Sequence, residues 1–139
     1  MVGCGESTDT VIQTGATARS QIVANGVSLP SSATDFYYAF QPQFSDHLDT
    51  WISFSATPAD CMIAAQAVAG KKIPTPVFIS GTRSQHNNVT GGPAYHQPKY
   101  ASSYWNLSTI THGSMFECKG LFVLVDTDKN KVYISLRAP

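Results

Sequence analysis

One helix with clear signals at both ends most constrains how this chain can fold. It begins at Thr57-Pro58-Ala59-Asp60, where threonine suits the N-cap, proline suits the first helical position, and an acid three residues after the cap is a variant of the capping box. Gly70 ends it, and the lysines that follow suit the negative end of the helix dipole. Nearly all residues between are apolar, so this helix must pack on a sheet.

Two strands precede the helix and share one predicted hairpin. Residues 35–41 place aromatic side chains alternately on two faces until Pro42 ends the strand. Residues 50–56 place Trp51 on one face and Ile52 and Phe54 on the other. The polar residues 43–49 form the connection between the two strands.

The remaining elements complete an α+β domain. Residues 18–27 predict a short strand or a helical turn, and residues 77–79 a short strand. Residues 80–111 lack periodicity and predict a long surface excursion. Residues 115–125 and 131–137 predict a hairpin with a turn over 126–130 and a bulge at Gly120. We therefore expect an antiparallel sheet of four to five strands with one main helix packed on a face.

Length and charge set the domain count and exclude some partners. The chain has 139 residues, of which 42% are hydrophobic, and its formal net charge is zero. We expect a flexible tether over 1–18 and one globular domain over 19–139. With neither a basic stripe nor a Lys/Arg run, a nucleic-acid partner is not expected. No apolar run has the roughly 18 residues that a membrane-spanning helix needs.

The first residues suggest a lipid anchor. Val2-Gly3-Cys4 resembles the end of a bacterial lipobox, whose cysteine becomes the lipidated first residue of the mature protein. The charged and apolar parts of a signal peptide are missing from this sequence, so we expect the gene start or the cloned fragment to have been cut there. The alternative is a cysteine that lies near a disordered start by accident. Under the lipoprotein interpretation, Cys4 anchors the protein to a membrane leaflet through its acyl chains.

Assigning Cys4 to lipid leaves Cys61 and Cys118 as a pair. An oxidising cell envelope would permit a disulfide between them, worth about 4 kcal/mol in the chain-entropy model. The alternative is that both are small buried hydrophobic residues. The sequence leaves both open.

The residues that could carry chemistry form no recognised catalytic or metal-binding pattern. The four histidines, His47, His86, His96 and His112, lack the spacing of a zinc site. The turn Asp126-Thr127-Asp128-Lys129-Asn130 matches the first half of a calcium loop, but the required glycine and bidentate glutamate are missing. No GxSxG or SxxK motif occurs. We predict no catalytic residue, no metal site and no cofactor.

Aromatic side chains are the best candidates for binding. The excursion carries Tyr95, Tyr100, Tyr104 and Trp105, and Trp51 lies on a strand face. Aromatic rings with polar tips suit surfaces that are both apolar and hydrated, as at protein interfaces or sugar platforms. The alternative is that the loop folds back and its rings cover the open face of the sheet.

Several short motifs resemble those of small bacterial lipoproteins and secreted proteins of unknown function. The residues that carry the resemblance are Leu29 to Phe36 (LPSSATDF), Trp51 to Phe54 before the helix, Tyr104-Trp105, Leu121 to Asp126 (LFVLVD) and Val132 to Ile134. Proteins of this kind carry an LPxSAxD turn and a terminal VLVD…VYI hairpin. The resemblance implies export and a lipid anchor, and it supplies no catalytic residues.

From these observations we expect a non-enzymatic lipoprotein of the bacterial cell envelope whose domain binds a protein or glycan partner. One alternative is an immunity protein that neutralises a secreted toxin through the aromatic loop. Another is a small hydrolase that uses a serine or histidine of residues 80–112.

Overall fold

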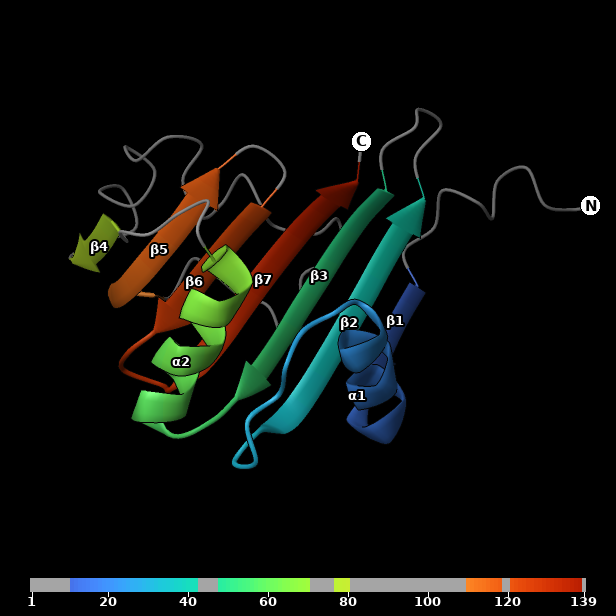
Figure 1. The fold of residues 1–139 in the computed structure, drawn as a ribbon, viewed down its shortest axis with the longest axis horizontal. Coiled ribbons are helices and arrows are strands. Elements are labelled where there is room, and N and C mark those ends of the chain that lie inside the picture. Colours follow the sequence, from blue (N-terminus) through green and yellow to red (C-terminus); the bar gives the residue numbers. More distant parts are fainter. Residues whose placement is uncertain (1–10, 43–47, 71–76, 81–109, 119–120, 139) are drawn as a thin grey trace, which may run out of the picture.

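A computed structural model describes residues 11–42, 48–70, 77–80, 110–118 and 121–138. They form one antiparallel sheet of seven strands with two helices (Figure 1). The predicted α+β class and antiparallel sheet are confirmed, and the sheet is wider than the four to five strands expected.

The strands lie in the order β1-β2-β3-β7-β6-β5-β4. Their bounds are β1 Val11–Thr14, β2 Thr34–Pro42, β3 Leu48–Ser55, β4 Val77–Ser80, β5 His112–Cys118, β6 Leu121–Asp126 and β7 Lys131–Ala138. The helices are α1 Gly15–Ala24 and α2 Pro58–Ala69. The last strand, β7, enters the middle of the sheet and pairs with β3 from Leu48↔Ala138 to Ser55↔Lys131.

The described residues begin at Val11, and strand β1 and helix α1 occupy residues 11–24, so the predicted tether is wrong over residues 11–18. Residues 11–14 form β1 and pair with β2 from Val11↔Phe40 to Thr14↔Tyr37. The next residue begins α1, which resolves residues 18–27 as mainly helix. Only Ala18 and Ile22 of α1 are buried, and two positions four apart give too short an apolar stripe to reveal a helix in the sequence.

The region expected to be one strand over 115–125 is two strands. β5 and β6 pair in antiparallel register from Gly113↔Asp126 to Cys118↔Leu121, so the region contains two neighbouring strands. The predicted single strand over 115–125 is therefore wrong, and Gly120, where a bulge was predicted, lies outside the described residues. The error has a physical cause: β6 buries apolar side chains on both faces, and a continuous apolar run shows no alternation that would mark its boundaries.

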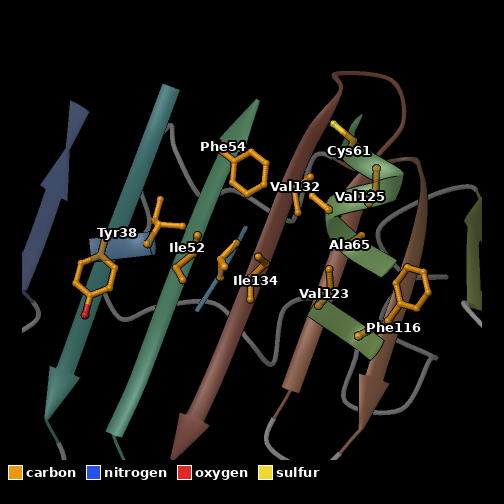
Figure 2. Packing of buried hydrophobic residues seen from close by; sticks show 14 of the residues in the cluster. Tyr38, Ile52, Phe54, Cys61, Ala65, Phe116, Val123, Val125, Val132 and Ile134 are labelled. Carbon is orange, nitrogen blue, oxygen red and sulfur yellow. The ribbon is translucent and has the colours of Figure 1, made fainter. Parts of the chain in front are cut away.

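Both faces of the sheet carry a buried cluster. Helices α1 and α2 lie on the same face (Figure 1), and there Cys61 and Ala65 of α2 point toward the valines of β6 and β7 (Figure 2). The opposite face carries a second cluster formed by Tyr37, Ala39, Trp51, Ile110, Met115, Phe122, Leu124 and Tyr133. The sheet is thus a central layer, which explains why its strands are apolar on both sides.

The turn before β2 and the start of α2 are joined by a hydrogen-bond relay. The backbone N–H of Thr57 donates to the Ser32 hydroxyl oxygen at 3.1 Å, and that hydroxyl donates to Asp60 Oδ2 at 2.7 Å. The Asp60 N–H donates to Thr57 Oγ1 at 3.4 Å. The predicted cap at Thr57 is confirmed, and Ser32 completes it, because Asp60 reaches the Thr57 N–H only through that hydroxyl.

Candidate functional site

Of the predicted lipidation, aromatic-binding and histidine residues discussed first, most lie outside the described part of the chain, and Trp51 lies in the core. Cys4 and the aromatic residues Tyr95, Tyr100, Tyr104 and Trp105 lie outside the described residues, as do His47, His86 and His96. Trp51 is 6% exposed and belongs to the second cluster, so it is a core residue of the sheet and is not available at a binding surface.

Cys61 is a free, buried thiol in the structure. Its Sγ–H donates to the carbonyl of Ala56 at 3.5 Å, and the Ala56 N–H donates to the carbonyl of Asn130 in the β6–β7 turn. Cys118, whose side chain is not described, pairs with Leu121 at the opposite end of β6. The predicted Cys61–Cys118 disulfide is therefore not formed here, because the two cysteines belong to opposite ends of the sheet. Cys61 matches the alternative of a buried hydrophobic residue.

The most exposed large apolar side chain in the described part of the chain belongs to an edge strand. β4 pairs with β5 on one side, from Val77↔Met115 to Ser80↔His112, and is the last of the described strands. Phe78 of β4 is 75% exposed. This exposed fraction is larger than that of Ile63 of α2 (62%), Val23 of α1 (55%) and Ile12 of the other edge strand, β1 (45%).

The sequence of β4, VFIS, is only four residues long but lacks the charges and proline that often protect an edge strand from pairing. It contains no charged residue and no proline, and its register with β5 runs through four consecutive pairs without a bulge. An edge strand presents backbone N–H and C=O groups that can pair with another extended chain. Strand β4 can therefore accept an extended peptide through backbone hydrogen bonds and contact it through Phe78.

A second polar group lies where β5 begins. The side chain of Asp128 accepts two hydrogen bonds at the same atom, Oδ2: one from the Thr111 hydroxyl at 3.0 Å and one from His112 Nδ1 at 3.0 Å. Thr111 Oγ1 and His112 Nδ1 are 3.2 Å apart. The hydrogen bond from His112, followed by that from Thr111, lowers the pKa of the Asp128 carboxyl. The group holds an anion beside an imidazole at the surface.

The histidine of this group has its Nδ1 held by a carboxylate, as in a catalytic base. Its hydrogen bonds within the described residues go to Thr111 and Asp128, so no serine or cysteine nucleophile is paired with it there. The other histidines of the hydrolase alternative, His86 and His96, lie outside the described residues.

The side chain of Asp126 holds the turn between β6 and β7 by accepting hydrogen bonds from the backbone of the turn. Asp126 Oδ1 accepts hydrogen bonds from the backbone N–H of Asp128 at 3.0 Å and of Lys129 at 3.2 Å. Asp126 is only 1% exposed. Burial, together with the charge of Asp126, raises the pKa of Tyr133, and burial lowers the pKa of Lys131, whose Nζ lies 5.4 Å from the centre of the Tyr133 ring. The aspartate at 126 therefore has a structural role in this turn.

The described residues contain neither a metal-binding cluster nor a membrane-spanning helix. No group of three or more His, Cys, Asp or Glu side chains is placed to hold a metal ion in that part of the chain. Among the same residues, no helix is long and apolar enough to cross a membrane.

Neither the edge position of β4 nor the contact between His112 and Asp128 was predicted from the sequence. The strand 77–79 was predicted, but its position at the sheet edge depends on the long connection through α2, which no local pattern encodes. The contact between His112 and Asp128 joins residues 16 apart, and it forms because β5 and β6 pair in one register. A correct assignment of the β5–β6 hairpin would have revealed it.

Comparison with known proteins adds no further constraint. The chain matches no family model, and neither the curated proteins nor the solved structures contain a match to it.

Proposed function

We propose that this chain is the domain of a bacterial envelope lipoprotein that is anchored through a lipid on Cys4 and binds a protein partner without catalysing a reaction. The observation that carries the binding part is the edge strand β4, with its uncharged sequence and its exposed Phe78. The anchor is supported by the resemblance of Val2-Gly3-Cys4 to a lipobox.

The chemistry of β4 favours protein over glycan as the partner. Its available groups are backbone donors and acceptors in a line, which match the backbone of another extended segment. Glycans are bound by exposed rings with polar tips, but Trp51 is buried and the other candidate rings lie outside the described residues. The described residues thus offer a peptide-binding edge.

Site-specific photocrosslinking tests the binding proposal. A photoreactive amino acid replaces Phe78 in the full chain expressed in its own envelope, and the same replacement at Ile63 is the control because Ile63 is also apolar and exposed. We expect a discrete crosslinked product from position 78 only. Equal products from both positions, or none from position 78, would contradict a partner at β4.

A charge substitution gives an independent test of the same edge. Phe78→Lys should abolish the crosslink formed by a probe at Ser80, because charged edge strands resist pairing. Ile63→Lys should leave it intact. Should the captured partner prove to be a secreted toxin, the immunity alternative would be favoured over other binding roles.

The lipid anchor needs its own experiment. Metabolic labelling with an alkyne fatty acid should label the full-length precursor at Cys4, and Cys4→Ser should remove both the label and the membrane fractionation. Membrane fractionation that is unchanged in Cys4→Ser would rule out the anchor and leave the binding proposal standing.

A further inference from the structure

One strand, β7, joins two parts of the sheet that do not pair with each other. Strands β1 to β3 lie on one side of β7 and strands β4 to β6 on the other (Figure 1). Among the described strands, β7 is also the last along the chain. We propose that β7 is a closing strand, meaning that neither part of the sheet is stable until residues 131–138 have inserted between β3 and β6. This role of β7 is independent of the proposed protein-binding edge.

The backbone of β7 has partners on both sides. Every residue from Lys131 to Leu136 has a register partner in β3 and another in β6, and both pairings are antiparallel. Without β7, strands β3 and β6 would both be edge strands, and the backbone groups that now face β7 would have no strand to pair with. Insertion of one strand therefore completes two hydrogen-bonded ladders at once.

The side chains of β7 complete the buried cluster on each face of the sheet. On the helix-covered face, Ile134 is fully buried and lies between Ile52 of β3 and Val123 of β6 (Figure 2). On the opposite face, Tyr133 belongs to the second cluster, which also includes residues of β3 and β6. Without β7, the apolar side chains of β3 and β6 on both faces would lose the neighbours that bury them, at a cost in hydrophobic free energy.

The first part of the sheet is too small to be stable by itself. Its elements β1, α1, β2 and β3 occupy residues 11–55, and even a domain of about 60 residues buries a marginal fraction of its surface. Ser32 joins this part to the start of α2 through hydrogen bonds, but polar contacts of this kind contribute little net stability. The first part therefore depends on β7 for its missing neighbour.

The second part of the sheet is completed late in synthesis. Helix α2 packs on β5, β6 and β7, but these strands begin only at His112, long after α2 ends at Ala69. Contacts between segments so far apart require loop closure, whose entropic cost comes before the gain from packing. Strands β5 and β6 directly precede β7 in the chain, so the second part gains its own strands and the closing strand almost together.

Folding on the ribosome tests the closing role of β7. The full chain is joined through linkers of increasing length to a translational arrest peptide, whose arrest is released by the force of a folding chain. We expect release only at linker lengths that place β7 outside the exit tunnel. Ile134→Asp, which puts a charge between β3 and β6, should abolish the release, and the same change at Ile63, which is 62% exposed, should preserve it. Release while β7 is still inside the tunnel, or release that persists in Ile134→Asp, would overturn the proposal.

Hydrogen exchange of the folded full chain gives a second test that uses conservative variants. Ile52→Val alters β3 and Val123→Ala alters β6, so each removes buried methyl groups from one part only. If β7 joins the parts into one cooperative unit, the slowest-exchanging amides of β2 and β5 should exchange faster by the same factor in each variant, at least about twofold. Faster exchange confined to the part that carries the substitution would show that the parts unfold independently, which contradicts a closing strand.

Discussion

At the scale of single residues, Cys61 and Gly113 are small residues at tightly packed positions of the fold. Cys61 is fully buried on the helix-covered face, where burial raises the pKa of its thiol. Gly113 in β5 lies opposite Asp126 and has no room for a larger side chain. At both positions the small size of the residue is what allows the neighbouring elements to pack closely.

Cys61 should be unreactive until the protein unfolds. The thiolate is the reactive form, and both burial and the raised pKa of the thiol disfavour it. In native protein at pH 8, iodoacetamide labelling measured by peptide mass spectrometry should leave Cys61 unmodified, whereas unfolding in guanidinium should expose it. Recovery of Cys61 in a disulfide with Cys118 under non-reducing conditions would contradict the free thiol.

Gly113→Ala should destabilise the sheet. A Cβ at this position would lie 2.5 Å from the carbonyl oxygen of Val125 and 3.2 Å from Leu124 Cδ1, so the backbone of β6 would have to move. We expect a loss of about 2 kcal/mol in the free energy of unfolding, typical of overpacking, measured by urea denaturation. Thr127→Ala, at an exposed position, should change it by less than about 0.5 kcal/mol.

At the scale of elements, one corner of the fold is formed by a turn and a helix that are joined by side-chain hydrogen bonds. The turn contributes Ser32 to the cap of α2, and Asp35 lies at φ 54°, beside the register shift between Thr34 and Tyr37. Asp is among the few residues that adopt this left-handed conformation readily. The LPSSATD sequence thus has a structural explanation at both its serine and its aspartate.

Ser32→Ala should therefore weaken the start of α2. The substitution removes an acceptor for the Thr57 N–H and a donor to Asp60, and loss of a cap costs about 1 kcal/mol. Urea denaturation should show this loss, and Ser31→Ala, at the exposed neighbouring position, should show almost none. Equal stability of the two variants would mean that the relay contributes nothing.

These elements show where local sequence suffices to predict structure and where it fails. Helix α2 was predictable because Thr57, Pro58 and Gly70 mark its ends through contacts within a few residues. Helix α1 was predicted only as a short strand or a helical turn over 18–27, and strand β1 was missed, because both are stabilised by packing on β2. The boundary between β5 and β6 was not predicted because it lies within an apolar run. The His112–Asp128 contact, which depends on the pairing of these two strands, was therefore not predicted either.

At the scale of the whole molecule, the sheet has buried clusters on both faces, and among the described residues its outermost strands β1 and β4 each pair on one side only. The helices cover one face, and the second cluster is buried on the other. Of the two edge strands, β4 carries the more exposed apolar side chain. We therefore expect a partner to bind at the β4 edge of the sheet.

Tyr133, which is buried on the face of the sheet opposite the helices, should make the free energy of unfolding sensitive to alkaline pH. Burial and Asp126 raise the pKa of Tyr133 above its ordinary value of 10.0, so the folded state holds the phenol proton more tightly than the unfolded state. The corresponding stability is present below pH 10 and is lost as the pH rises through the folded pKa. The lowered pKa of Lys131 acts in the opposite direction, at pH values below the ordinary lysine value of 10.5.

Comparison with Tyr133→Phe isolates the tyrosine. Free energies of unfolding measured between pH 8 and pH 11 should fall less steeply in Tyr133→Phe than in the unmodified chain, because phenylalanine has no proton to lose. Parallel pH profiles would contradict the assignment of this sensitivity to Tyr133.

Hydrogen exchange in the complex tests the central claim, that β4 binds a partner by adding a strand to the sheet, most directly. The captured partner is added to the full chain, and exchange of the backbone amides is followed by mass spectrometry. Strand addition predicts slower exchange across Val77–Ser80, with no change in the exposed residues around Ile63 of α2. Exchange that is unchanged across β4 while another surface becomes protected would contradict binding at this edge.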